Sequence, residues 1–397
     1  MQPTRRGFLL TSAAALSLGG AFLGGASLSV RAAETDNRFV LVFLRGAMDG
    51  LNVVVPYGDA NLKLWRPSLV LPEPGAEKGL ADLGGFWGLH PSLKAMHALY
   101  AANDLLPIQC VAGPNRSRSH FEAQDMMEIG AETRMTSGWL NRIAALLPVN
   151  PHCDMAFTMG SMPPLILHGP TPTTTWDPFH TRPRVSAGFY DNIVAMHAQD
   201  ARTGADVADG LRERRHIDAI LAGTTYDGLS PGFPRLARAA ARMLAAPDGP
   251  RLAELELDGW DTHTGQPPRL AEALGKLDEG IAVLRAGLAE VWTKTAILVV
   301  TEFGRTVRVN GSGGTDHGTG TAAILMGGAV AGGRVLADWP GLGARQLFED
   351  RDLQPTLDIR AVTKGLLGPL LGLSAAGLTK VFPDSESVTP RSGLLKV

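Results

Sequence analysis

Carboxylate, imidazole and guanidinium side chains are concentrated in the stretch AILVVTEFGRTVRVNGSGGTDHGTGTAAILM, residues 296–326. Glu302 and Arg305 follow a short apolar run, and Asp316 and His317 precede a second one. Carboxylates and neutral imidazoles are ligands of divalent cations such as Zn²⁺ or Mn²⁺, and an arginine beside them suits an anionic group. The alternative is that these residues are solvated loop acids and a turn histidine. We favour a functional site, because all four lie close together between two expected core strands.

Asp261 and His263 form a second group of this kind, in LDGWDTHTG after the apolar run 251–257. An Asp-x-His pair at a strand end brings two metal ligands near one point. Asp49 stands in an Asp-Gly pair after the apolar run 39–44. It is either a ligand delivered by a first, central strand or simply a turn residue.

A third group follows the apolar run 105–112, in the sequence GPNRSRSHFE. Ser119 and Glu122 match a capping box, which predicts a helix start. A hydroxyl at a helix start after a buried strand also lies where a phosphate or sulfate ester would meet free backbone N–H groups and a positive dipole. Ser119 is therefore our first candidate nucleophile, with Ser117 second.

Basic side chains surround this predicted helix start. Arg116 and Arg118 indicate an anionic substrate, although they are equally compatible with ordinary surface charge. His120 and Arg305 are further catalytic candidates, and Asn52 is a candidate for substrate binding.

The elements that must position these residues are short apolar runs alternating with helical patterns. Leucines at spacings of four and three over 270–291 predict an amphipathic helix that joins two strands as a βαβ unit. The pattern predicts an α/β fold with a mostly parallel central sheet and helices on both faces. Strands are expected at 39–44, 105–112, 251–257, 296–301 and 322–326, and further helices at 139–147, 205–221, 234–246 and 358–371.

Residues 137–225 differ in character from the rest of the chain. They are rich in Pro, Thr and His and show no strong periodicity. We expect an insertion that caps the sheet, within a single domain of residues 34–397.

The N-terminus carries the sequence TRRGFLL, a twin-arginine pattern, followed by a weakly apolar run rich in Ala and Gly. This predicts a Tat export signal over residues 1–33 and a periplasmic or extracellular protein, with the Tat translocase as a transient partner. Glycines interrupt the run, so no permanent membrane span is expected.

Overall composition is that of an ordinary globular enzyme. The 397 residues are 45% hydrophobic and 19% charged, with a net charge of −2, and this balance does not indicate nucleic-acid binding. Cys110 and Cys153 allow one disulfide, but nothing in their spacing demands it.

Taken in order, the motifs FVLVFLRGAMDGLN, NRSRSHFEAQD, LDGWDTHTGQ, TEFGRTVRVNGSGGTDHG and DIRAV resemble the alkaline phosphatase-like superfamily, which includes sulfatases. They are most similar to a large family of Tat-exported bacterial proteins of unknown function. The superfamily resemblance implies an alkaline phosphatase-like α/β fold and a two-metal site. Phe303 departs from the pattern, because it stands where a second histidine ligand would be, and Asp316 is the candidate to compensate.

Carried over by position, the resemblance implies a set of metal ligands from several strand ends. The implied metal is Zn²⁺ or Mn²⁺, with Ca²⁺ or Mg²⁺ as alternatives. These ligands are Asp49, Asp261, His263, Glu302, Asp316 and His317.

Two functions are compatible with these motifs. The first is an exported metal-dependent hydrolase of small phosphate or sulfate esters. The second is a catalytically degenerate member of the superfamily, which keeps the fold and acts as a periplasmic binding or envelope-associated protein.

Overall fold

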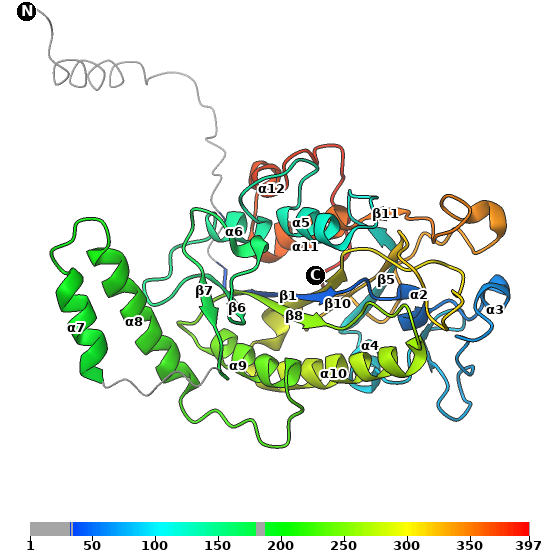
Figure 1. Ribbon diagram of the computed structural model, residues 1–397, viewed down its shortest axis with the longest axis horizontal. Helices are drawn as coiled ribbons and strands as arrows, with labels where there is room; N and C mark the ends of the chain where they lie inside the picture. Colours follow the sequence, from blue (N-terminus) through cyan, green and yellow to red (C-terminus); the bar gives the residue numbers. More distant parts are fainter. Residues whose placement is uncertain (1–31, 33–34, 180–186, 397) are drawn as a thin grey trace, which may run out of the picture.

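The computed structural model describes residue 32, residues 35–179 and residues 187–396 (Figure 1). Apart from Ala32, the predicted export signal lies outside these residues. The chain forms three layers, in which a central sheet is enclosed between two groups of helices.

The central sheet has eight strands in the order β11-β5-β10-β9-β1-β8-β6-β7. All neighbouring pairs are parallel except those of β10, which runs antiparallel to both β5 and β9. The predicted fold class is therefore confirmed. The strands are β1 (Arg38–Arg45), β5 (Leu105–Ala112), β6 (Ala156–Met159), β7 (Thr174–Trp176), β8 (Leu252–Asp258), β9 (Thr295–Thr301), β10 (Thr321–Met326) and β11 (Leu357–Asp358).

Strand β1 lies at the centre of the sheet, between β8 and β9. All of its residues except Arg45 are buried, and β9 is buried throughout. Both faces of these strands are covered, which explains why their sequences are continuous apolar runs rather than alternating ones.

Helices cover both faces of the sheet (Figure 1). The long helix α10 joins β8 to β9, and its predicted apolar face is buried against one side of the sheet. With α10 lie α4 (Lys94–Ala101) and α9 (Phe233–Ala245), whereas α5, α6, α11 and α12 cover the other side. Their bounds are α5 (His120–Ile129), α6 (Trp139–Ala144), α10 (Gln266–Gly287), α11 (Ile359–Leu371) and α12 (Ala375–Val381).

Residues 137–225, which we expected to cap the sheet, instead contribute two strands to it. Strands β6 and β7 extend the sheet beyond β8, and α6 packs on its core. Helices α7 (Ala187–His197) and α8 (Gly204–Leu221) lie at the left of Figure 1, and the C-terminal part of α8 packs on the core through Ile217. The low periodicity reflects short edge strands and loops.

The remaining elements are short. They include a three-stranded sheet in the order β2-β4-β3. Their bounds are α2 (Gly50–Val53), β2 (Val54–Val55), α3 (Asn61–Trp65), β3 (Ala81–Asp82), β4 (Gly88–Leu89), η1 (Leu165–Leu167), η2 (Ala289–Lys294) and η3 (Ala344–Gln346).

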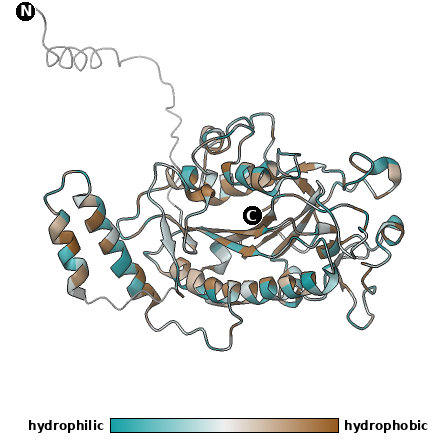
Figure 2. Cartoon of the chain, in the orientation of Figure 1, coloured by the Kyte–Doolittle hydropathy of each residue, from teal (hydrophilic) through white to brown (hydrophobic). Residues whose placement is uncertain are grey.

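Hydropathy follows this layered arrangement. Figure 2 shows hydrophobic residues concentrated in the central strands, with mixed colouring along the covering helices. Within the described residues, no helix combines the length and the apolar character needed to cross a membrane. Cys110 and Cys153 are both buried and free, so they do not pair.

Candidate metal centre

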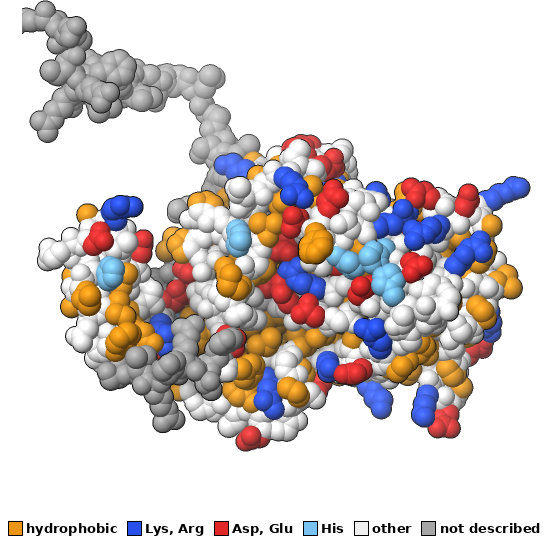
Figure 3. Space-filling model, in the orientation of Figure 1, with side chains coloured by type: hydrophobic (Ala, Val, Ile, Leu, Met, Phe, Trp, Pro, Cys, Tyr) orange, Lys and Arg blue, Asp and Glu red, His pale blue; other side chains and the backbone are white. Residues whose placement is uncertain are grey.

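The candidate residues meet at the carboxyl edge of the parallel strands. His120 begins α5 after β5, Asp261 and His263 follow β8, and Glu302 follows β9. His317 reaches the same edge because it precedes β10, which runs in the opposite direction. Figure 3 shows histidine side chains gathered on this exposed face.

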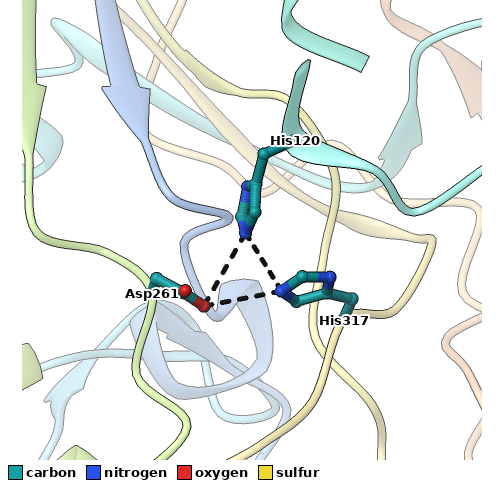
Figure 4. A group of neighbouring side chains, drawn as sticks. All are labelled: His120, Asp261 and His317. Carbon is teal, nitrogen blue, oxygen red and sulfur yellow. Dashed lines mark hydrogen bonds and ion pairs between the residues drawn. The ribbon is translucent and has the colours of Figure 1, made fainter. Parts of the chain in front are cut away.

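Three imidazoles and one carboxylate converge there. The Nε2 atom of His317 lies 3.0 Å from Nε2 of His120 and 3.0 Å from Nε2 of His263. Oδ1 of Asp261 lies 3.0 Å from Nε2 of His263, 3.6 Å from that of His317 and 3.8 Å from that of His120. Figure 4 shows how His120, Asp261 and His317 point toward one another.

The opposite nitrogen of each ring is engaged by an acceptor. Nδ1 of His120 lies 2.8 Å from Oε1 of Glu302, and Nδ1 of His317 lies 2.9 Å from the carbonyl oxygen of Arg118. A carbonyl only accepts hydrogen bonds, as does an ionised carboxylate, so Nδ1 carries the proton in both rings. In the neutral rings, Nε2 therefore presents a lone pair to the centre.

His263 is oriented in the same way. Its Nδ1 lies 2.9 Å from Oδ1 of Asp316, which also accepts a hydrogen bond of 3.0 Å from the Asn310 amide. Orientation of a ligand histidine by a carboxylate or carbonyl is characteristic of metal sites.

The electrostatics keep the acids ionised. Burial alone would raise the pKa of Glu302, but hydrogen bonds from His120, Gln124 and Thr301 outweigh it and lower this pKa to about 2. Burial would likewise raise the pKa of Asp261. The hydrogen bond and the charge interaction with Arg305 outweigh burial, so this pKa is lowered.

The ring of His317 is kept neutral. Burial lowers its pKa, and the neighbouring His120 lowers it further. The pKa of Asp316 is lowered mainly by the hydrogen bond from Asn310, against the effect of partial burial.

This donor set fits a divalent cation. Nitrogen lone pairs that face each other at 3.0 Å repel unless a positive charge lies between them. Two ligands held about 2.0–2.1 Å from a tetrahedral Zn²⁺ are themselves roughly 3.3 Å apart, which is close to the separations observed. Imidazole with carboxylate suits Zn²⁺ or Mn²⁺ better than Ca²⁺, which prefers oxygen ligands.

Two glycines allow the loops around the centre to approach closely. A Cβ atom on Gly314 would lie 2.4 Å from the backbone of His263. A Cβ on Gly46, whose φ is +119°, would lie 2.6 Å from the backbone nitrogen of Asp261. Glycine is thus required at both positions for these loops to pack against each other.

Arg305, a catalytic candidate, is 1% exposed and donates to several backbone oxygens and to Asp261. Its guanidinium reaches the carbonyls of Gly46, Ala47 and Trp260 at 2.7–3.1 Å. Because it has no open donor toward solvent, it holds the loops after β1, β8 and β9 in place and positions Asp261.

The remaining basic candidates are also engaged. Arg118 pairs with Glu349 and with Asp352, at 2.5 and 2.8 Å. Its φ of +57° directs its carbonyl toward His317. Arg116 donates to the backbone oxygens of Gly113 and Asn115.

The serine candidates lie just before α5. The helix begins at His120 with Ser119 at the N-cap position, as predicted, but the Ser119 side chain makes no capping hydrogen bond. The hydroxyl of Ser117 donates to the Asn115 amide oxygen at 2.8 Å. Ser119 thus has the less constrained hydroxyl of the two.

Asp49 and Asn52 are not brought into this centre. Arg66 donates to both, at 2.6 and 2.5 Å, and Gln266 donates to Asp49. Sequence reasoning missed Arg66, Gln266 and Gln124, because none of them stands in a ligand-type motif. His120 had been assigned a catalytic role, and its position among the ligand atoms emerges only from the fold.

Comparisons with known proteins give a family and a set of similar folds. A family model described as "Protein of unknown function (DUF1501)" matches residues 101–382. Among curated proteins, none matches the chain.

Similar solved structures include a protein in the alkaline phosphatase superfamily from Vibrio parahaemolyticus, with 9% identity, a TM-score of 0.40, and coverage of 93% of this chain and 76% of that one. Alkaline phosphatase from the Antarctic bacterium TAB5 shows 10% identity, a TM-score of 0.35, and coverage of 76% of this chain and 95% of that one. The C-terminal periplasmic domain of EcEptC from Escherichia coli, in complex with Zn, shows 11% identity, a TM-score of 0.37, and coverage of 91% of this chain and 90% of that one.

Proposed function

Since the chain belongs to the DUF1501 family, whose function is unknown, we propose from its site that it is an exported metal-dependent hydrolase of phosphate or sulfate esters. One observation carries the proposal: the lone pairs of three imidazoles and the carboxylate of Asp261 converge on one point at a strand-end edge. Sites of this kind in α/β folds lie at the carboxyl ends of the strands.

The residues of the chain have separate roles in this proposal. His120, His263, His317 and Asp261 hold a divalent cation, preferentially Zn²⁺ or Mn²⁺. When bound, the cation supplies Lewis acidity toward an oxygen of the ester. Glu302 accepts a hydrogen bond from His120, and Asp316 accepts one from His263, so these two carboxylates fix the orientation of the two rings.

Ser119 is the proposed nucleophile, because its hydroxyl stands at the start of α5 directly before His120. The N-terminus of this ten-residue helix favours an anionic group. Arg351 donates to the His317 carbonyl and lies 3.4 Å from Asp352, and its side chain is 40% exposed, so it is the arginine most accessible to such a group. Arg118 and Arg305 are already neutralised by carboxylates.

Export is the second part of the proposal. The twin-arginine pattern at Arg5 and Arg6 supports passage through the Tat translocase into the periplasm or beyond. That route carries folded protein, which suits a metal centre assembled from three separate segments.

The test is elemental mass spectrometry of the exported protein, purified without chelator, together with assays on p-nitrophenyl phosphate and p-nitrophenyl sulfate. Wild-type protein should contain Zn or Mn and hydrolyse at least one ester. The Asp261→Ala/His317→Ala double variant should lose both properties. Wild-type protein without bound metal would refute the metal-dependent mechanism.

A specific observation supports the second candidate, a degenerate binding protein. Phe303 stands where a further ligand was expected, and its ring packs 4.9 Å from that of His120 and 5.2 Å from that of His317. Metal content together with no turnover of phosphate or sulfate esters would favour this candidate.

A further inference from the structure

Asp49 lies in a buried ion pair that is separate from the three imidazoles. Its side chain and that of Arg66 are each 1% exposed, and Nη1 of Arg66 lies 2.6 Å from Oδ2 of Asp49. The amide of Gln266 donates to the same oxygen. A carboxylate buried this deeply needs a positive partner, and Arg66 is that partner.

The guanidinium of Arg66 occupies a cage of oxygen atoms. Besides Asp49, it donates to the side-chain oxygen of Asn52 at 2.5 Å and to the carbonyls of Thr306 and Val307 at 2.7 and 2.9 Å. Carboxylate, amide and carbonyl oxygens are the ligands of a hard cation. Arg66 takes Oδ2 of Asp49 and the other three oxygens, whereas Oδ1 of Asp49 is buried without a hydrogen-bond partner among the described residues.

Glu302, the other ligand expected for a second cation, is also fully engaged. Its Oε1 accepts hydrogen bonds from the Gly46 backbone, His120 and Gln124 at 2.8–2.9 Å. Its Oε2 accepts from the Thr301 hydroxyl at 2.8 Å. Glu302 therefore orients His120, and both of its oxygens already accept hydrogen bonds.

The position at which a second histidine ligand was expected is occupied by a phenylalanine. Phe303 is 5% exposed and packs against two of the imidazole rings. An apolar ring fills this place and offers no lone pair. Among the described residues, His120, Asp261 and His317 form a group with metal-ligand spacing, and Asp49 is not part of it. Nε2 of His263 adjoins this group, at 3.0 Å from both Asp261 and His317.

We infer that this chain binds one cation and not two, and that Arg66 supplies to Asp49 the positive charge that a second cation would supply. The inference rests on the proposed metal centre and defines its stoichiometry. It follows from the chemistry of the residues around Asp49, which are hydrogen-bond donors where a second metal would require lone pairs.

The test is a titration of Zn²⁺ into the apo form of the whole exported protein, followed by elemental mass spectrometry. Wild-type protein should retain about one equivalent, as a single four-ligand site requires. Asp49→Asn should also retain about one equivalent, with a Kd within about threefold of wild type, because residue 49 does not touch the cation. His317→Ala should retain almost none.

Asp49→Asn leaves the Arg66 charge buried without its counter-ion, so this variant could fail to fold. The double variant Asp49→Asn/Arg66→Met removes both charges and should fold, as judged by circular dichroism and thermal unfolding. It should bind the same single equivalent as wild type.

Each stoichiometry has a distinct meaning. One equivalent in wild type and in the double variant supports the inference. Two equivalents in wild type, or the loss of one on substitution of Asp49, would overturn it while leaving the metal-dependent hydrolase in place. Zero equivalents in wild type would overturn the proposed function and this inference with it.

Discussion

At the scale of single residues, the imidazoles are oriented by acceptors from distant parts of the chain. Glu302 accepts from His120, which lies 182 positions away in the sequence. The pKa of Glu302 is about 2, since hydrogen bonds from His120 and Gln124 outweigh the effect of burial, so this acceptor is ionised at neutral pH.

Glu302→Gln should therefore weaken metal binding about 10–100-fold, the usual cost of losing a charged partner behind a ligand histidine. The glutamine keeps the shape and an acceptor oxygen but loses the charge. The Kd for Zn²⁺ is measured by competition with a chelating dye. Glu272→Gln, at a 70% exposed position on α10, is the matched control and should leave the Kd unchanged. Equal affinity in both variants would contradict the assigned role of Glu302.

His90 provides a second residue-scale prediction, on pH and stability. Burial lowers its pKa to about 4 from the ordinary value of 6.5. Between these pH values the unfolded chain binds a proton that the folded chain does not. The free energy of unfolding should therefore fall as the pH decreases from about 6.5 to 4, by up to about 3 kcal/mol from this residue.

Urea unfolding at several pH values measures this effect. His90→Gln should reduce the fall in stability between pH 6.5 and 4, because the buried imidazole is gone. His97→Gln on the neighbouring helix α4 retains His90 and should show the same fall as wild type. An unchanged pH dependence in His90→Gln would disprove the contribution of His90.

At the scale of elements, the contact between α9 and α10 depends on a glycine. A Cβ on Gly280 would lie 2.3 Å from the ring of Phe233, which is 2% exposed in α9. Gly275 lies in the same helix, and a Cβ atom built at this position would meet no neighbouring atom within 4 Å. The two positions therefore separate packing from helix propensity.

Gly280→Ala should lower the free energy of unfolding by about 1 kcal/mol or more, since overpacking costs about 1–3 kcal/mol and exceeds the gain in helix propensity. Gly275→Ala should raise it by about 0.5–1 kcal/mol. Both values come from denaturant unfolding at one pH. Stabilisation by both substitutions would show that α9 and α10 pack less closely than described.

At the scale of the whole molecule, three separate segments must come together before the metal centre exists. His120, Asp261, His263 and His317 come from loops at the ends of β5, β8 and β10. Assembly of such a site before export suits the Tat route, which transports folded chains.

The proposed Tat signal predicts that Arg5→Lys/Arg6→Lys is retained in the cytoplasm, because paired arginines of this kind are an address read by a receptor. Cell fractionation and immunoblotting measure the distribution. Arg31→Lys, outside the pair, is the control and should be exported normally. Normal export of the double variant would argue against the Tat signal.

Local sequence was sufficient for the elements that carry the site. The apolar runs and the leucine spacing of α10 predicted β1, β5, β8, β9 and the βαβ unit, because each pattern follows from burial on one or two faces. The family resemblance was confirmed by the matching family model. The antiparallel direction of β10 and the strands β6 and β7 were not predicted, because chain direction and sheet order depend on long-range pairing.

The composition of the centre was decided by tertiary structure. From its motif, Asp49 was either a ligand or a turn residue, and Arg66 and Gln266 hold it outside the centre. His120 joined the ligand atoms only because β5 and β8 end at the same edge of the sheet. Residue types and strand ends can be read from the sequence alone. Which lone pairs meet, and which already accept from a buried donor, depends on tertiary contacts, some between segments more than 180 positions apart.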